Sequence, residues 1–300
     1  MSRGPRLVAM SPLARELDFR VASNRFAVFW TAVAFVVVSV ALGINDRPWS
    51  EAAFDGLLSA IGVFLAWAIG RELDPDHPAT ARWAGLLALL YVGVLGPPSL
   101  LASATVLVMG RILVRTTGLA PRGLDLVVLV IGGVLSAHTL AGATAALVLA
   151  TALVVDLQME DPAPTGPMAA AAVDILIGGA IVLFVADPQP WAQPTTTELL
   201  VAAPLVLALY PGPRARLRSV GDVTGAPLDV RRLAMARRLA IVAVPAAVLV
   251  GGQDEVARLT PVVAAVVGLG LNNIRRAVQG RSRAGWGDSA PDWTGPTAEH

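Results

Sequence analysis

Long apolar runs dominate the chain, and short polar stretches or Gly/Pro pairs separate them. Several runs approach the roughly 20 residues that an α-helix needs to cross about 30 Å of hydrocarbon. They lack the alternation of apolar and polar residues that is typical of a barrel strand. Backbone amides in lipid must also be satisfied within the segment. The pattern therefore predicts an all-α fold, a polytopic transmembrane helical bundle.

About ten apolar segments can be distinguished, with a range of eight to ten. The third and fourth are separated only by Gly96-Pro97-Pro98 and the fifth and sixth only by His138, Thr139 and their neighbours, so each pair is predicted to form a tight hairpin. Fusing one pair would lower the count. Asn272 and Asn273 mark the predicted end of the last span. The predicted spans cover residues 26–44, 53–70, 80–96, 98–114, 123–138, 140–155, 168–186, 198–211, 238–252 and 256–272.

The arginines predict the orientation of these spans, because arginine flanking a span concentrates on the cytoplasmic side. The chain contains no lysine, so arginine supplies the whole of this signal. Ten alternating crossings place all 23 arginines on the cytoplasmic side except Arg47 and Arg258. This agreement favours ten spans and places both termini in the cytoplasm.

The domain organisation follows from the spans. Residues 1–25 form a cytoplasmic N-terminal arm, residues 26–279 the transmembrane helical domain, and residues 280–300 a disordered cytoplasmic tail. A cytoplasmic Arg-rich loop covers 212–237, with a short surface helix predicted over 230–238. The segment 53–59 faintly resembles 172–178, which would fit a five-plus-five inverted repeat of the kind found in secondary transporters.

Composition narrows the class of protein further. Hydrophobic residues make up 55% of the chain and charged residues 15%, which is far from a soluble mixture. A net charge of +1 gives no case for a nucleic-acid partner. Without cysteine there is no disulfide, thiolate nucleophile or cysteine metal site. We expect a multi-pass protein of a prokaryotic plasma membrane whose partners are the lipid bilayer and anionic headgroups at the cytoplasmic arginine clusters. No cofactor, metal site or catalytic residue is predicted.

Asp174 is the charged residue predicted to lie deepest in an apolar segment, about six residues into the seventh span. At 1.5 Å per residue this is roughly 9 Å along the helix. A carboxyl group at that depth is costly and by default a functional candidate. If the helix starts later, Asp174 is instead an ordinary N-terminal residue favoured by the helix dipole.

Arg111 and Arg115 lie four residues apart near the cytoplasmic end of the fourth span and share a helix face. Either one could reach Asp174 or the carboxylates that follow the second span. As a pair they could clamp an anion or phosphate, for which a forked guanidinium is well suited. The alternative is that both extend toward lipid headgroups and pair opportunistically.

The segment Arg71–Pro78 is the densest polar insertion between apolar runs. It follows the second span and lies on the predicted cytoplasmic face, as does the acidic stretch after the sixth span. Two acid-bearing loops on one face are the arrangement that a magnesium-diphosphate enzyme requires. The alternative is a turn closed by two prolines, with an acidic residue capping the third span. The members of this predicted cytoplasmic-face polar cluster are Arg71, Glu72, Asp74, Asp76, His77, Asp156 and Glu160.

The chain lacks the Asn-Asp-x-x-Asp-x-x-x-Asp pattern of intramembrane prenyltransferases and any phosphate-binding glycine loop. No family assignment follows. Three hypotheses remain. A small-molecule or ion transporter is favoured by the span count, the Gly/Pro-interrupted helices and Asp174. A lipid- or isoprenoid-modifying membrane enzyme would use the carboxylates and arginines of the cytoplasmic face. A non-catalytic membrane assembly subunit would explain the lack of any strong motif.

Overall fold

The computed structural model describes residues 11, 13, 17–159, 167–185, 196, 203–210, 217–251 and 254–287. Its elements are helical, apart from an isolated β-bridge between Val220 and Pro227 in the described residues. The all-α prediction is therefore confirmed. The elements are α2 (Ala22–Gly43), α3 (Trp49–Leu73), α4 (Pro78–Leu95), α5 (Leu100–Val114), α6 (Gly123–Ser136), α7 (Leu140–Gln158), α8 (Pro167–Val185), the 3₁₀ helix η1 (Ala203–Leu209), α10 (Val230–Gly251), α11 (Asp254–Arg258) and α12 (Thr260–Gly287).

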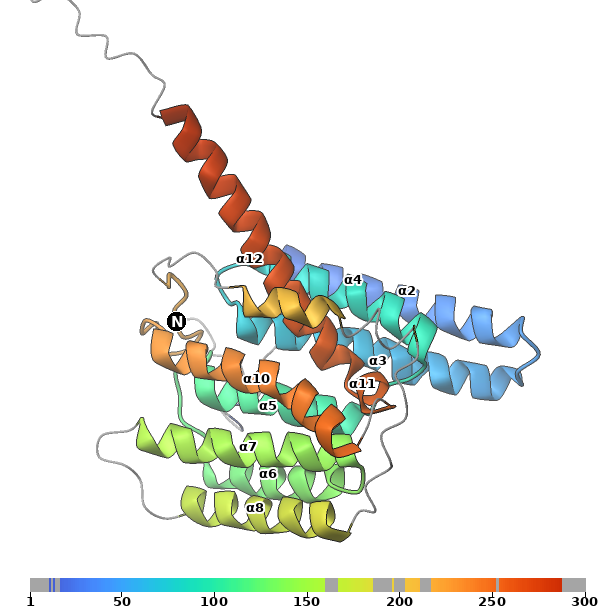
Figure 1. The fold of residues 1–300 in the computed structure, drawn as a ribbon, viewed down its shortest axis with the longest axis horizontal. Coiled ribbons are helices and arrows are strands. Elements are labelled where there is room, and N and C mark those ends of the chain that lie inside the picture. The colour runs from blue at the N-terminus through green and yellow to red at the C-terminus, as the bar shows by residue number, and fades with distance from the viewer. Residues whose placement is uncertain are drawn as a thin grey trace, which may run out of the picture.

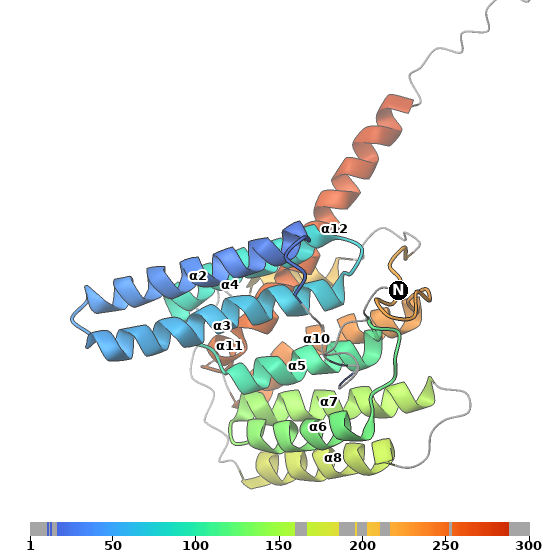
Figure 2. The same cartoon turned by 180° about the vertical axis from the view of Figure 1, so that it is seen from behind.

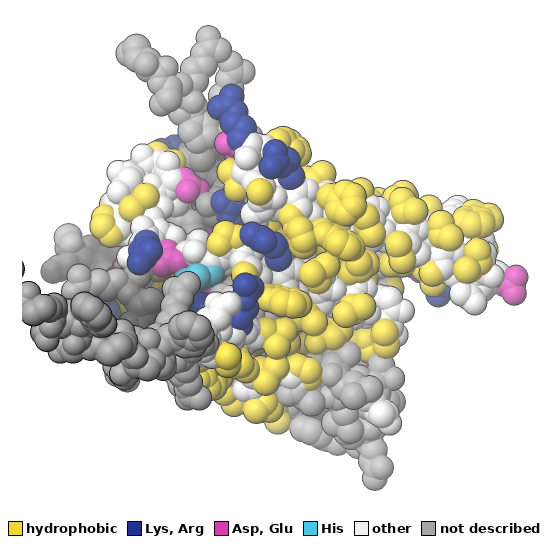
Figure 3. Space-filling model, turned by 90° about the horizontal axis from the view of Figure 1, so that it is seen from above, with side chains coloured by type: hydrophobic (Ala, Val, Ile, Leu, Met, Phe, Trp, Pro, Cys, Tyr) yellow, Lys and Arg dark blue, Asp and Glu magenta, His cyan; other side chains and the backbone are white. Residues whose placement is uncertain are grey.

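Four of the described helices, α2, α3, α4 and α7, are long and apolar enough to cross a membrane. Their outer surfaces are apolar as well: Phe29, Leu90 and Val94, for example, are each more than half exposed. Figure 3 shows a broad hydrophobic surface of this kind, with most of the charged side chains of that view gathered toward one end. A helix that is apolar on its exposed face is suited to lipid rather than water. The count of about ten spans and the cytoplasmic position of the termini stay predictions.

The helices pack into two groups, which Figures 1 and 2 show as upper and lower layers. In the first group, α2, α3, α4 and α12 pack against one another; in the second, α5, α6, α7 and α8 do so. Contacts between α3 and α5 join the groups, and α10 packs on α5 and α7 while also touching α12 and α3. The first group combines helices from both ends of the chain, and the five-plus-five repeat stays a prediction.

Small residues allow the helices of the first group to approach closely. A Cβ added at Gly70 would lie 3.0 Å from the Cβ of Ala84, and one at Gly268 would lie 2.9 Å from the backbone nitrogen of Ala84. Both α3 and α12 therefore reach the backbone of α4 through a glycine. Ala66, one turn before Gly70, is fully buried. Gly70 thus gives α3 the close approach to α4 that small residues allow.

Two predicted boundaries are wrong. The segment expected as a separate surface helix over 230–238 is the beginning of α10, which runs without a break into the predicted ninth span. Arginine has good helix propensity, so two Arg-Arg pairs do not end a helix. Asn272 and Asn273 do not end the helix but lie inside α12, and both are buried. Asn272 can be buried because its side chain donates to Asp74.

The chain does break between the predicted third and fourth spans, but the two helices, α4 and α5, do not pack on each other as the predicted hairpin requires. Gly96 adopts φ +85°, a conformation that favours glycine, and the chain then passes through Pro97 and Pro98. The backbone N–H of Ser99 donates to the carbonyl of Arg258 at 2.9 Å, which fixes the start of α5 beside α11. As a result α5 packs against α7 and α3 instead of α4. The predicted fifth and sixth spans, α6 and α7, do pack on each other.

Candidate functional site

Most of the buried charged groups gather at one end of the bundle, which we call the polar face. The C-terminal ends of α3, α5 and α7 meet there with the N-terminal ends of α2, α4 and α10, as their side-chain contacts show. Arg47 and Arg258 lie at the opposite end, where Arg47 pairs with Asp55 and Arg258 with Glu255. These two arginines are thus separated from those of the polar face, and which end faces the cytoplasm stays a prediction.

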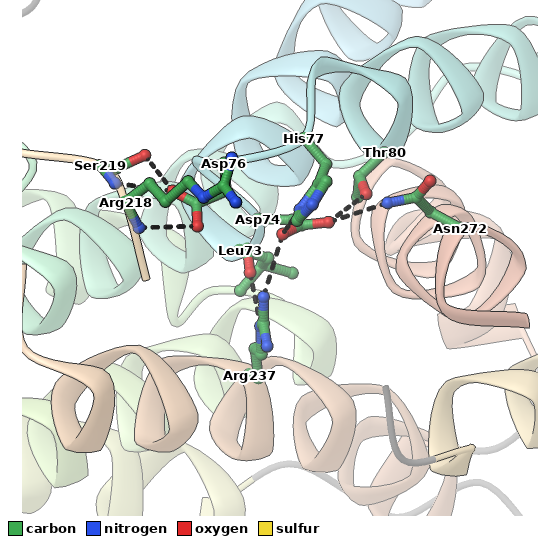
Figure 4. A network of polar contacts seen from close by, with 9 residues as sticks. All are labelled: Leu73, Asp74, Asp76, His77, Thr80, Arg218, Ser219, Arg237 and Asn272. Atoms are coloured by element: carbon green, nitrogen blue, oxygen red, sulfur yellow. Dashed lines mark hydrogen bonds and ion pairs between the residues drawn. The ribbon is translucent and has the colours of Figure 1, made fainter. Parts of the chain in front are cut away.

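Asp74 is the centre of the first cluster, which we call the Asp74 network. Its carboxylate is 2% exposed and lies immediately after α3. It accepts hydrogen bonds from Thr80 Oγ1 at 2.6 Å and Asn272 Nδ2 at 3.0 Å. Its other oxygen lies 2.9 Å from His77 Nδ1 and 3.1 Å from Arg237 Nη2 (Figure 4). Four partners from α4, α10, α12 and the turn therefore satisfy one buried carboxylate, as burial of a charge requires.

Arg237 makes a second contact in this network, because its Nε donates to the backbone carbonyl of Leu73 at 2.6 Å. The carbonyls at the end of α3 lack helical partners, so a cation there is favoured by both the free acceptor and the helix dipole. Burial lowers the pKa of Arg237, as does the neighbouring Arg276, while Asp74 raises it. Arg237 thus attaches α10 to the end of α3 by two bonds.

Asp156 is the centre of the second cluster, the Asp156 network, which joins α5, α7 and α10. The carboxylate is fully buried. Arg115 binds it with two parallel hydrogen bonds, Nε to Oδ1 at 3.2 Å and Nη2 to Oδ2 at 2.8 Å. Arg232, which is itself buried, donates to Oδ1 as well. A bidentate guanidinium and a second arginine give this carboxylate strong, directional partners.

Arg111 is a fourth arginine that pairs with a carboxylate on the polar face. Its Nε lies 3.3 Å from Glu72 Oε1, which is 2% exposed, and its Nη1 donates to the carbonyl of Leu13 at 2.8 Å. Arg111 therefore pairs with a carboxylate of the Arg71–Pro78 segment, which is one of the partners predicted for it. Arg71 donates to Asn24 on α2 and its guanidinium lies over the ring of Trp67, 5.6 Å from the centroid.

Asp76 holds the chain segment before α10 instead of taking part in the Asp74 network. Its carboxylate accepts from the backbone N–H groups of Arg218 at 3.0 Å and Ser219 at 2.7 Å, and from the Ser219 hydroxyl (Figure 4). Burial alone would raise the pKa of this carboxyl, but these hydrogen bonds and the nearby His77 outweigh it and lower the pKa.

The turn between α3 and α4 has the two prolines that were predicted, but no acidic cap. His77 occupies the N-cap position of α4 and makes no capping hydrogen bond, while Pro78 is the first helical residue. Asp74 binds Arg237 and Asn272 as well as the nearby His77 and Thr80, and Asp76 binds the segment before α10. The cap prediction is wrong because local sequence does not show that α10 and α12 bring competing donors to this turn.

The structure brings together some of the predicted candidates and separates others. Asp74, Asp76 and His77 line one small cavity, whereas Asp156 lies in a separate network with Arg115. No group of three or more His, Asp or Glu residues suited to a metal ion occurs among the described residues. The predicted second acidic loop also relied on Glu160, which lies outside the described residues. Asp74 and Asp156 thus pair with different arginines, Asp76 accepts from backbone N–H groups, and these carboxylates do not converge on one point.

Asp174 lies in the interior of α8, because this helix begins at Pro167. The alternative in which Asp174 starts the helix is therefore wrong. The side chain of Asp174 lies outside the described part of the structure. α8 packs against α6 and α7 at the edge of the second group of helices. Arg111, which was predicted as a partner of Asp174, is bound to Glu72 and Leu13 instead.

Several residues of the polar face were not predicted as site residues: Arg232, Arg237, Thr80, Asn272 and Ser219. A signal for the first two was present. Leu233, Ala236 and Ala240 form a buried stripe at helical spacing, and Arg232 and Arg237 border that stripe. No local signal marks Thr80 or Asn272, whose importance depends on which helices are neighbours.

No family model, curated protein or solved structure matches this chain. The fold and the site alone therefore define its class, which is an all-helical protein in which four of the described helices are candidate membrane spans and charged networks lie at one end. Apolar helices of this kind are compatible with an integral membrane protein in a lipid bilayer.

Proposed function

We propose that the chain is a small-molecule or ion transporter of a prokaryotic plasma membrane, with the polar face toward the cytoplasm. The observation that supports this most directly is the set of ion pairs that join the two groups of helices, either directly or through α10. Arg111 joins α5 to Glu72 on α3, and Arg237 joins α10 to Asp74. Alternating access rocks one bundle against another. Ion pairs that lie at one end only can separate and hydrate in one state and re-form in the other.

The helix α10 is the element that would couple the two groups. Arg232 holds it to the second group through Asp156, while Arg237 holds it to the first group through Asp74 and Leu73. Pro245 lies inside α10, where it removes one backbone hydrogen bond and allows the helix to bend. We propose that α10 carries movement between the groups and that Asp174 is a proton or ion pathway residue, because a carboxyl inside a span is costly.

Flux measurements on purified protein in liposomes test this proposal. A pH-sensitive dye inside the vesicles would report coupled proton movement while a panel of small cations and anions is added outside. The expected result is saturable flux above that of empty vesicles. Asp174→Asn should abolish the proton-coupled part without changing the elution profile of the protein. Arg237→Gln should alter the rate, whereas Arg238→Gln, at an exposed neighbour, should not.

Flux equal to that of empty vesicles for every solute would contradict transport. In that case the non-catalytic assembly subunit, which the absence of strong motifs also allows, would be the better description. Pull-down of a membrane partner with the full chain would then be the next measurement.

A further inference from the structure

A cavity of about 600 Å³ lies on the polar face, beside the Asp74 network. Three separate parts of the chain form its wall: the turn between α3 and α4, the segment before α10, and α12. The residues that carry its charge are Asp76, His77, Arg218 and Arg276. A smaller cavity of about 90 Å³ adjoins it through Asp76, His77 and Arg276 and adds Asp74 and Arg237 to the same surroundings.

Positive charge is in excess around this cavity. The cavity walls carry the guanidiniums of Arg218, Arg237 and Arg276 but only two carboxylates. Both of these carboxylates already accept hydrogen bonds from the protein. Asp74 accepts from four groups of its own network, and Asp76 accepts from the backbone of Arg218 and Ser219. Among the described residues Arg276 forms no ion pair, although it is partly buried. An anion in the cavity would therefore meet donors that the protein does not itself saturate.

Two electrostatic features reinforce this preference. Arg237 and Arg276 line the smaller cavity together, and their like charges repel, so each lowers the cost of placing an anion between them. In addition, the wall includes Pro78, the first residue of the 18-residue helix α4, whose N-terminal end carries partial positive charge.

We propose that this cavity binds a phosphate group, supplied either by a free phosphate ester or by the headgroup of an anionic lipid. A phosphomonoester carries about −1.5 to −2 charge at neutral pH and offers three acceptor oxygens. Guanidinium forks match that geometry with paired, charge-assisted hydrogen bonds. The cavity is large enough for a ligand beyond the phosphate alone, since ligand pockets typically span about 300–1,000 Å³. The inference rests on this cavity and does not require transport.

Binding to the full chain in phosphatidylcholine nanodiscs tests the free-ester source, with inorganic phosphate and glycerol 3-phosphate as calorimetric probes. For the lipid source, phosphatidic acid is added to the nanodiscs and the copies retained by the protein are counted by native mass spectrometry. For each probe that binds the wild-type protein, Arg276→Gln should raise the Kd about tenfold or more, because the variant loses a charge-assisted contact. Arg275→Gln is the matched control, because Arg275 is adjacent and exposed but does not line the cavity.

Arg218→Gln provides a second variant if Arg276→Gln does not fold. Only the backbone N–H of Arg218 binds Asp76, so this substitution removes charge and leaves that hydrogen bond in place. Failure of phosphate, glycerol 3-phosphate and phosphatidic acid to bind the wild type would overturn the inference. Equal weakening by Arg275→Gln would also overturn it, since it would show general surface charge instead of a site. If phosphate binds but no solute is transported, the phosphate site stands and the transport proposal is refuted. If other solutes are transported but no phosphate probe binds, the transport proposal stands and the phosphate site is refuted.

Discussion

Asp74 and Asp156 stabilise the polar face in the same way, by accepting from arginines on helices that are distant in sequence. They differ in the solvent exposure of those arginines. The side chain of Arg232, which binds Asp156, is 9% exposed, whereas that of Arg237, which binds Asp74, is 31% exposed. Water screens a partly exposed pair and weakens its contribution. The Asp156 network should therefore be the more sensitive of the two to loss of its carboxylate.

Asp156→Asn should lower the free energy of unfolding by about 3–5 kcal/mol, because removing the carboxylate leaves the charge of the buried Arg232 without its ion-pair partner. Thermal unfolding of the detergent-solubilised protein would measure this loss. Asp46→Asn is a suitable control: Asp46 is exposed and has φ +62°, a conformation that asparagine also tolerates. If both substitutions shift the melting temperature equally, the buried pair is not a stabilising element.

Glu255 gives a prediction about pH at the opposite end of the bundle, in α11. Burial raises the pKa of its carboxyl, and Arg258 opposes this only in part. The folded protein then binds the proton more tightly than the unfolded chain, so the contribution to stability is present below about pH 4.5 and is lost as pH rises through the folded-state pKa. Glu255→Gln should therefore raise the melting temperature at neutral pH and flatten its dependence on pH. A lower melting temperature of the variant at neutral pH would contradict this sign.

At the scale of elements, the sequence predicts the positions of most helices along the chain, but it predicts poorly which helices pack against one another. Apolar runs of membrane-spanning length indicate helices whatever they pack against, so α2, α3, α4 and α7 lie close to their predicted positions. The ends of α10 and α12 were misplaced because arginine and asparagine usually mark helix ends in membranes. Here Arg232 and Asn272 have partners inside the bundle, which only the packing of the helices reveals. For the site, the sequence indicated that Arg111 could reach a carboxylate after α3, but it did not indicate the pairing of Asp74 with Arg237 or of Asp156 with Arg232.

The packing of α12 on α4 gives a prediction at this scale. Gly268→Val would place methyl groups against the backbone of α4, where even a Cβ lies 2.9 Å from Ala84 N and 3.1 Å from the carbonyl oxygen of Thr80. Overpacking of this kind typically costs about 1–3 kcal/mol, so the melting temperature should fall. Gly93→Ala in α4 is the control, because no atom lies within 4 Å of its added Cβ. Equal stability of Gly268→Val and wild type would show that α12 does not pack this closely.

At the scale of the whole molecule, charge and apolar surface are separated along the axis of the bundle. The Asp74 and Asp156 networks lie on the polar face, as does the cavity that we propose to bind phosphate, here called the phosphate cavity. Arg47 and Arg258 lie at the other end. Between them the exposed faces of the helices are apolar. This arrangement agrees with the sidedness inferred from arginine alone, although contacts between helices do not show which end faces the cytoplasm.

Single-cysteine labelling decides that orientation, and the absence of cysteine from the chain makes the background clean. Ser50 is exposed at the start of α3 at the end opposite the polar face, and Ala226 is exposed in the segment before α10. We expect a membrane-impermeant maleimide to label Ser50→Cys in intact cells and to label Ala226→Cys only after the membrane is opened. Arginine-rich segments are retained in the cytoplasm during insertion, which is the physical reason for this sidedness. Labelling of Ala226→Cys in intact cells would reverse the orientation and place the phosphate cavity outside the cell.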